Sequence, residues 1–333
     1  MPTVPVRPQE PRIGLVLGAG GTVGQAYQAG VLAAIEQDVG WDPRDAEVIV
    51  WTSAGSITGA LLRLGVPAAD LAAWAVEAPL SADGRPLEQL LGGERLDFPP
   101  MTLRTFLRPP RLPSPALMAS IARRPWRFRP SVALMTLLRP GEVDLARYGT
   151  ELDRMCAEGW LDRLYVCAAR RDNGRRVVFG RPGAPKAPPS KAVAASCAIP
   201  GYFRPVEIGG VEYFDGGVHS ATNATVLRND DLDLVIVVSP MSAAPGARPK
   251  LDTPLRRAMG RQLQREARQL RKTCTQVVVF EPGDDTLGVM GVNMMAPDRS
   301  ERTVQRSFIE AGSQPAMQQL RALMPRQAAD AAG

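Results

Sequence analysis

Two glycine-rich turns near the start of the chain constrain its fold more than any other feature. The first has the sequence Gly-Ala-Gly-Gly-Thr-Val-Gly over residues 18–24, and the second has Thr-Ser-Ala-Gly-Ser over residues 52–56. Each follows a short apolar run, Ile13 to Leu17 or Glu47 to Trp51, and each precedes a segment whose apolar residues have helical spacing. Strand, turn and helix repeated in this way predict a parallel α/β sheet.

The rest of the chain is predicted to add further strands and helices to this first strand–helix repeat. Short apolar runs predict strands near 164–168, 176–179, 212–214, 233–238 and 276–280. Periodic apolar residues predict helices over 22–37, 54–64, 67–77, 145–157, 255–272 and 300–324. In the helix over 255–272 we expect the apolar stripe to pack on the core, with the arginine-rich face in solvent. Its members are Leu255, Met259, Leu263, Ala267 and Leu270.

The two turns have complementary chemical properties. Unblocked backbone N–H groups at a helix start, such as the first turn offers, hold a negative charge. Ser53 lies at a strand-to-helix bend, which is the position of a nucleophile elbow. The simpler alternative is that Ser53 only caps the next helix. A serine nucleophile beside an anion-binding turn favours acyl transfer.

A dinucleotide site is a competing interpretation of the first turn. Gly18, Gly20 and Gly24 fit part of the glycine fingerprint of such sites. That fingerprint also requires an acidic residue at the end of the second strand to bind ribose. Here the second strand ends in Trp51-Thr52-Ser53. A nucleotide-dependent oxidoreductase is therefore disfavoured.

The base that activates Ser53 is expected to be Asp215. It follows an apolar run and begins an Asp-Gly-Gly sequence, which offers a carboxylate on a stiff turn, although such a sequence is usually only a turn. His219 is the only histidine, so an ordinary Ser-His-Asp triad has one possible centre. We expect Asp215 to accept the proton directly and His219 to have a structural role.

Three motifs together resemble those of the patatin-like phospholipases, and the resemblance covers most of the chain. They are residues 17–24, residues 52–56, and the stretch over 194–203 that leads to the Asp-Gly-Gly sequence at 215–217. The resemblance implies a three-layer α/β fold with a central, mainly parallel sheet flanked by helices. It also implies hydrolysis of lipid acyl esters with neither metal nor cofactor.

The same resemblance implies a role for each matched position. Ser53 would be the nucleophile and Asp215 the general base of a catalytic dyad. Gly18, Gly20 and Gly21 would line the oxyanion hole. Four further small residues would support the turns at Ser53 and Asp215, namely Ala54, Gly55, Gly216 and Gly217.

Two positions depart from the family pattern. Trp51 stands where the family usually has glycine, two residues before the serine, and Val23 stands where many members have Arg or Lys. Glycine permits a tight elbow, so we expect the Trp51 indole to point away from the packed side, toward the acyl pocket. The departures leave two alternatives open, a lipid-binding or scaffold homologue with impaired catalysis and an esterase or thioesterase for small substrates.

The positive charge of the chain is concentrated in residues 101–140. This segment holds eight arginines, seven prolines and no acidic residue, so the rest of the chain carries −2 of the net +6. Trp126 and Phe128 lie among the arginines, a pattern that fits nucleic acid, a solvated cap or a membrane interface. We expect short helices forming a lid that contacts an anionic membrane surface, and no nucleic-acid partner.

The two ends of the chain and its cysteines give expectations about domain bounds and cellular location. We expect a flexible segment over 1–11, one catalytic domain over 12–325 that includes the lid, and a frayed tail over 326–333. The start lacks a readable secretory signal and no apolar run is long enough to span a bilayer, which predicts a cytoplasmic protein, peripheral at the inner membrane face. Metal ligands are not expected, and the cysteines are expected to be free thiols, mostly buried: Cys156, Cys167, Cys197 and Cys274.

Overall fold

The computed structural model describes residues 11–91, 112–123, 130–145, 150–156, 159–248, 252–273 and 276–324. Nearly all of both expected terminal segments lies outside these ranges. So do Cys274 and residues 101–111 and 124–129 of the expected lid. Within the described residues, no helix combines the length and the apolar character needed to cross a membrane.

A single sheet forms the centre of the described part of the chain. Its strands follow the order β5-β6-β3-β2-β1-β7-β8, and β4 pairs with β3 outside this path. Strands β3, β2, β1, β7 and β8 are mutually parallel, whereas β4 and β6 are antiparallel to β3 and β5 is antiparallel to β6. The expected central, mainly parallel sheet is confirmed. The strands are β1 (Ile13–Leu17), β2 (Val48–Thr52), β3 (Leu164–Arg170), β4 (Arg176–Phe179), β5 (Val206–Ile208), β6 (Val211–Asp215), β7 (Leu234–Val238) and β8 (Gln276–Phe280).

Helices follow most of the parallel strands. Short 3-10 turns, labelled η, join several elements, and two of them, η5 (Gly216–Val218) and η6 (Ala224–Asn229), lie near the predicted site. The α-helices are α1 (Gly21–Val39), α2 (Gly55–Arg63), α3 (Ala68–Ala75), α4 (Arg85–Leu91), α6 (Pro115–Arg123), α7 (Pro130–Leu137), α8 (Thr150–Met155), α9 (Pro189–Cys197), α10 (Thr253–Arg271), α11 (Asp284–Met290), α12 (Ser300–Ser313) and α13 (Pro315–Leu323).

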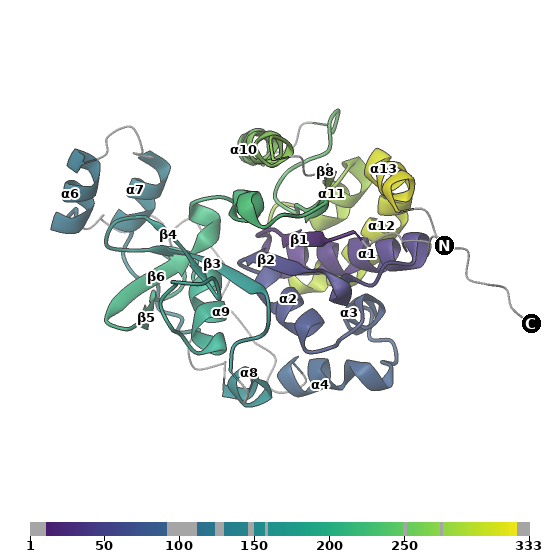
Figure 1. Ribbon diagram of the computed structural model, residues 1–333, viewed down its shortest axis with the longest axis horizontal. Coiled ribbons are helices and arrows are strands. Elements are labelled where there is room, and N and C mark those ends of the chain that lie inside the picture. Colours follow the sequence, from purple (N-terminus) through teal and green to yellow (C-terminus); the bar gives the residue numbers. More distant parts are fainter. Residues whose placement is uncertain are drawn as a thin grey trace, which may run out of the picture.

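The central strands are apolar throughout because both faces of the sheet are covered. Every residue of β1, β2 and β7 is buried, and alternate side chains of β7 enter two different cores. Leu234 and Ile236 join the core beneath α1, α2, α9, α12 and α13, and Val235 and Val237 join the core beneath α10 and η6. Helices therefore form a layer on each side of the sheet, with α10 opposite α2 and α3 (Figure 1).

Two details of the helical predictions are wrong. The single closing helix expected over 300–324 is two helices, because Pro315 has no N–H to continue α12 and instead begins α13. In α10, Leu263, Ala267 and Leu270 pack on the core as expected, but Leu255 is 52% exposed. In the first turn of α10 the buried side chain is Arg256, which is 3% exposed, and not Leu255.

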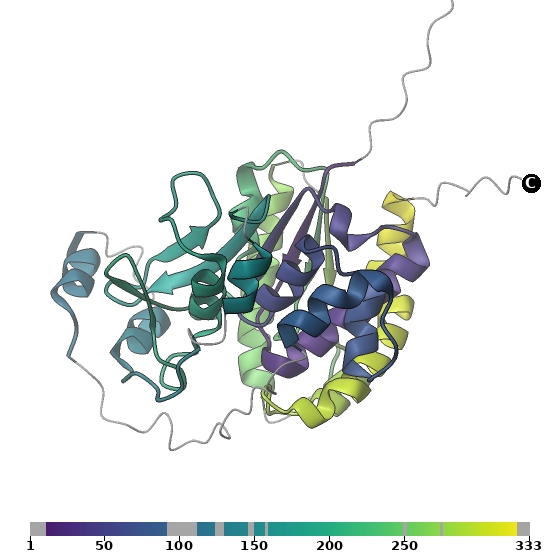
Figure 2. The ribbon, with the colours of Figure 1, turned by 90° about the horizontal axis from the view of Figure 1, so that it is seen from below.

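The described parts of the expected lid are helices α6 and α7. They lie at the end of the molecule opposite α13 (Figures 1 and 2). The turn between β3 and β4 holds this region, since the Ser114 hydroxyl donates to the Asp172 carbonyl at 2.5 Å and Arg171 donates to the Leu138 carbonyl at 3.3 Å. Helix α7 also contacts η5, the turn that follows Asp215.

The contact between α1 and α12 gives a test of the packing. A Cβ added at Gly30 would lie 2.5 Å from the Val304 carbonyl oxygen and would also clash with the Ser307 hydroxyl. Gly30→Ala should therefore lower the free energy of unfolding by about 1–3 kcal/mol, measured in urea. Gly312→Ala is the matched control, because a Cβ there meets nothing and alanine should stabilise α12 by about 0.5–1 kcal/mol. A neutral Gly30→Ala would contradict this packing.

Candidate active site

Ser53 occupies a strained bend between β2 and α2. Its φ of 56° lies in the left-handed region, which non-glycine residues rarely adopt. The bend is held by hydrogen bonds, since the Ser53 amide donates to the Ser196 hydroxyl at 3.0 Å and that hydroxyl donates to the Cys167 carbonyl at 2.7 Å. Gly55 lets α2 start close to β1, because a Cβ there would lie 2.5 Å from the Leu17 carbonyl oxygen. This is the geometry expected of a nucleophile elbow.

Asp215 reaches the same edge of the sheet from the antiparallel side. In the sheet register Thr52 lies beside Cys167 of β3, and the next residue of β3, Ala168, lies beside Asp215 of β6. The strand then turns sharply at Gly216, where a Cβ would clash with the Cys167 carbonyl oxygen. The Asp215 carboxylate accepts a hydrogen bond of 2.6 Å from the Gly217 amide.

The structure brings the two predicted catalytic side chains into contact. The Ser53 hydroxyl lies close enough to the Asp215 carboxylate to lower its pKa, and each residue is only 5% exposed. Burial raises the pKa of Asp215 to about 6, and the hydrogen bonds from Ser53 and the Gly217 amide limit the rise. A carboxylate with this pKa is ionised at neutral pH and can accept a proton.

In the first glycine turn, some backbone N–H groups donate hydrogen bonds within the fold and others have no acceptor. The Gly18 amide donates to the Val238 carbonyl at 2.9 Å, and the Ala19 amide donates to the Ala221 carbonyl at 2.7 Å. Among the described residues, the amides of Gly20 and Gly21 at the start of α1 have no hydrogen-bond acceptor. Gly18 therefore fixes the turn, while Gly20 and Gly21 keep donors available for a negative charge.

Glycine is required at position 21. Its φ of +59° is left-handed, and a Cβ would lie 2.5 Å from the Met294 carbonyl oxygen. The turn also lies against the Asp215 loop, because a Cβ added at Gly217 would lie 3.3 Å from the Ala19 Cβ. The free amides and the Ser53–Asp215 pair thus belong to one neighbourhood at the carboxyl edge of the sheet.

The side chains at the two positions that depart from the family pattern, Val23 and Trp51, are both buried in the core. Val23 is fully buried, and its amide donates to the Met294 carbonyl at 3.1 Å, so no cation supplements the turn at this position. The Trp51 indole is 1% exposed and packs on α2, where Gly59 leaves the space for the ring. The expectation that the indole points away from the packed side is therefore wrong.

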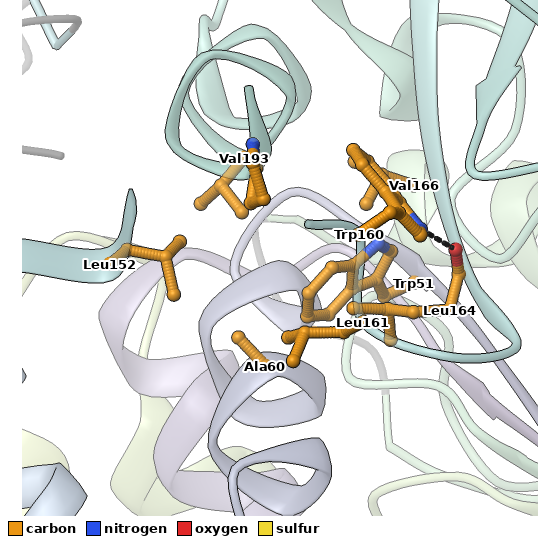
Figure 3. Close-up of a pocket in the computed structure, with 9 residues that line it drawn as sticks. Trp51, Ala60, Leu152, Trp160, Leu161, Leu164, Val166 and Val193 are labelled. Carbon is orange, nitrogen blue, oxygen red and sulfur yellow. Dashed lines mark hydrogen bonds between the residues drawn. The ribbon is translucent and has the colours of Figure 1, made fainter. Parts of the chain in front are cut away.

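Trp51 lies in an apolar compartment beneath the elbow (Figure 3). The compartment leaves no volume for a water molecule, and the indole N–H of Trp51 has no acceptor among the described residues. A buried donor without a partner is costly, so apolar packing of the ring must offset this cost. The other lining residues are Ala60, Leu152, Trp160, Leu161, Leu164, Val166, Pro189 and Val193.

Two residues that position the site were not identified from the sequence. Ser196 lies within the 194–203 motif, which was the only sign of its role. Asn223 is fully buried with a φ of 53°, and its amide group donates to the Thr52 hydroxyl at 3.1 Å and the Gly216 carbonyl at 3.2 Å. It thereby joins the end of β2 to the Asp215 turn. Tolerance of asparagine for left-handed backbone was its only sequence signal.

His219 is tied to the neighbouring helix α10. Its carbonyl accepts a hydrogen bond of 2.9 Å from the Gln262 side chain. On the same helix, the buried Glu266 carboxylate accepts from the Thr222 hydroxyl and the Ala224 amide, both at 2.9 Å. One face of α10 therefore fastens the segment that follows Asp215.

The described thiols match their expected character. Cys156 and Cys167 are buried and Cys197 is half-buried, and all three are free. Burial raises the pKa of both Cys167 and Cys197 to about 12, which keeps these thiols protonated at neutral pH. Within the described residues, no group of three or more His, Cys, Asp or Glu side chains is placed to hold a metal ion.

Comparison with known proteins decides the family. The model of the patatin-like phospholipase family matches residues 15–228, which include both glycine turns, Ser53 and Asp215. The chain belongs to this family. Patatin-like phospholipases are lipid acyl hydrolases that act on ester bonds, and the family assignment agrees with the three-layer fold.

Solved structures similar to this patatin-like chain share little of its sequence. VipD from Legionella pneumophila has 13% identity and a TM-score of 0.44, over 93% of this chain and 67% of that one. The type III effector ExoU has 15% identity and a TM-score of 0.34, over 94% of this chain and 54% of that one. ExoU in its complex with SpcU from Pseudomonas aeruginosa has 21% identity and a TM-score of 0.32, over 91% of this chain and 52% of that one. This chain thus spans about half of each ExoU chain. Among curated proteins, none matches the chain.

The packing of Trp51 gives a stability prediction. Trp51→Ala should lower the free energy of unfolding in urea by about 3–5 kcal/mol, because it leaves a cavity in an apolar compartment. Trp51→Phe should cost much less, since it keeps an aromatic ring and removes the N–H that lacks an acceptor. Equal losses in the two variants would contradict the packing described for the indole.

Burial of Asp215 gives a prediction for stability against pH. Its pKa rises from 3.8 to about 6 on folding, so the folded state binds more protons than the unfolded state between these values. Stability should therefore fall as pH rises through this window, by about 3 kcal/mol in total. Asp215→Asn should be more stable than the wild type at pH 8 by up to about 3 kcal/mol and similar to it at pH 3.5 in urea unfolding. Glu207→Gln, at an exposed position, is the control and should show no such difference.

Proposed function

We propose that this chain is a serine acyl hydrolase of the phospholipase A or lysophospholipase type, with Ser53 as nucleophile and Asp215 as general base. The observation that carries the proposal is the closeness of these two buried side chains at the carboxyl edge of the sheet. In α/β sheets this edge is where reacting groups gather. The open amides of Gly20 and Gly21 at the same edge supply the third element of the site.

The proposed reaction has two halves. Asp215 accepts the Ser53 proton while the Ser53 oxygen attacks the acyl carbonyl carbon, and the amides of Gly20 and Gly21 stabilise the oxyanion. The tetrahedral intermediate then expels the alcohol, which takes the proton from Asp215, and leaves an acyl-Ser53 ester. Water attacks this ester as Asp215 accepts its proton, and the second tetrahedral intermediate expels the Ser53 oxygen, which takes that proton back from Asp215 as the fatty acid leaves.

The environment of Asp215 suits a base that acts without histidine. Desolvation raises the pKa of its carboxylate to about 6, so the group is a stronger base than an exposed aspartate and is still ionised at neutral pH. The left-handed backbone at Ser53 holds the hydroxyl toward this carboxylate before substrate arrives. His219 keeps its structural role in this mechanism.

We also propose that the lid region over 101–140, within a catalytic domain over 12–325, contacts an anionic membrane surface. Three large apolar side chains in its described part are exposed, Leu112, Met118 and Leu134, as in an interfacial segment. The protein would then act from the cytoplasm as a peripheral enzyme on lipid acyl esters. The feature that suggested a catalytically impaired homologue, Trp51, leaves the Ser53–Asp215 contact intact and does not favour that alternative.

Covalent labelling tests the nucleophile. A fluorophosphonate probe should label the wild-type protein at a single serine, and Ser53→Ala should abolish labelling because the probe traps the activated hydroxyl. Ser313→Ala, an exposed serine on α12, is the control and should label as the wild type does. Hydrolysis of phospholipid vesicles and of a soluble short-chain ester should be lost with the label. Full labelling of Ser53→Ala would refute the assignment.

The pH dependence of the same labelling separates a dyad from a triad. The labelling rate should fall below about pH 6, as Asp215 becomes protonated, and Asp215→Asn should react at least a hundredfold more slowly. His219→Ala should keep the same pH profile. A profile whose acid limb disappears in His219→Ala would instead assign the base to the histidine.

A further inference from the structure

A large groove lies beside the face of α10 that points away from the sheet. Its walls are α10 and residues 243–248, and its volume is about 1170 Å³. Gly260 lies between Ser242 and Glu281 in this groove, at 3.7 and 3.8 Å from a Cβ added there. None of the residues assigned to the acyl-transfer site lines this groove.

Four exposed arginines of α10 line the groove. Their spacing of four, four and three residues places them on one face over three turns, a row of about 16 Å. Among the described residues, none of the four pairs with a carboxylate or donates a hydrogen bond. They are Arg257, Arg261, Arg265 and Arg268.

The carboxylates in the groove do not neutralise this row. Asp252 pairs with the buried Arg256, whose guanidinium also donates to the carbonyls of Pro240 and Ser242 at 2.8 and 3.1 Å. The Glu281 carboxylate is buried, and burial raises its pKa. The four exposed arginines therefore keep an uncompensated positive field over the groove.

The groove begins at the same edge of the sheet as the proposed catalytic pair. Because β7 and β8 are parallel, the connecting helix α10 starts at their carboxyl ends and runs back along the sheet. Arg256 binds the carbonyl of Pro240, and the Pro240 ring packs on the first glycine turn, 2.8 Å from a Cβ added at Gly20. The arginine row thus starts beside the turn that carries the open amides.

Two exposed apolar side chains lie on the first turn of α10 and in the loop after α11. Leu255 on the first turn of α10 is 52% exposed, and Val292 after α11 is 53% exposed. The loop that carries Val292 is held near α10 through Met294, whose sulfur contacts the Arg256 guanidinium at 3.6 Å. Exposed leucine and valine beside a cationic row is the composition of a surface that enters the headgroup region of a bilayer.

We propose that the groove of α10 binds the phosphate-bearing headgroups of an anionic membrane surface, and so holds the catalytic edge near lipid. Arginine forks match phosphate oxygens, and the length of the row exceeds what one phosphate needs. The apolar flank and the shared edge favour a membrane over a nucleic acid. The proposal rests on the proposed lipid hydrolysis and adds a second surface, separate from 101–140.

Vesicle co-sedimentation of a Ser53→Ala protein tests the proposal without hydrolysis. Binding should rise when phosphatidylglycerol is added to phosphatidylcholine vesicles at 30%, and it should weaken with salt. Joint replacement of Arg257, Arg261, Arg265 and Arg268 by glutamine should weaken this binding by up to about 600-fold, since each cation contributes roughly fivefold to binding an anionic surface. With Ser53 restored, the same four changes should leave hydrolysis of a soluble short-chain ester unchanged.

A charge-matched variant is the control. Lys191, Arg204, Arg228 and Arg302 are exposed cations outside the groove, and their joint replacement by glutamine changes the net charge equally. This variant should lose at most a few-fold in vesicle binding.

Three results would overturn the proposal. They are wild-type vesicle binding by the groove variant, an equal loss in the control variant, and arginine-dependent binding of a single-stranded oligonucleotide without vesicle binding. Loss of soluble-ester hydrolysis in Ser53→Ala, measured separately, keeps the outcome for the proposed reaction distinct from the outcome for the groove.

Discussion

The contact between the Ser53 hydroxyl and the Asp215 carboxylate depends on the register of three strands. Strand β3 lies between β2 and β6, parallel to the first and antiparallel to the second, so residues far apart in the chain reach adjacent positions at one edge. A slip of one residue in either pairing would turn one side chain to the other face of the sheet. Ser196 and Asn223 strengthen this arrangement by tying the elbow to β3 and to the Asp215 turn.

Burial gives the carboxylate its chemistry and also carries a cost. Asp215 is removed from water, and only the Ser53 hydroxyl and the Gly217 amide bond to its charge, so its pKa rises to about 6. The ionised form needed for catalysis is therefore the less stable form of the fold, as expected for a functional site. The strained backbone at Ser53 adds a second cost at the same place. The buried strands and close helix contacts around the site must supply the stability that offsets both.

The Trp51–Gly59 contact shows how the family elbow accommodates an unusual residue. A bulky side chain replaces the usual small one on β2, and a glycine on the facing turn of α2 makes room for it. With the indole in this position, the elbow has left-handed geometry at Ser53. The sequence showed the departure at Trp51, whereas the role of Gly59 follows only from its contact with the indole in the folded chain.

Local patterns in the sequence were sufficient for the parallel strands, the positions of both glycine turns, and Ser53 and Asp215 as candidates, because apolar runs and glycines act over a few residues. They did not predict the break at Pro315 or the exposure of Leu255, since the end of a core depends on what packs there. Nor could they separate Gly18 from Gly20 and Gly21, because the acceptor of the Gly18 amide is a carbonyl on a distant strand. The sequence alone determined which groups are present, whereas the tertiary structure decided which of them meet, which are desolvated and which amides stay free, because these properties depend on contacts between segments far apart in the chain.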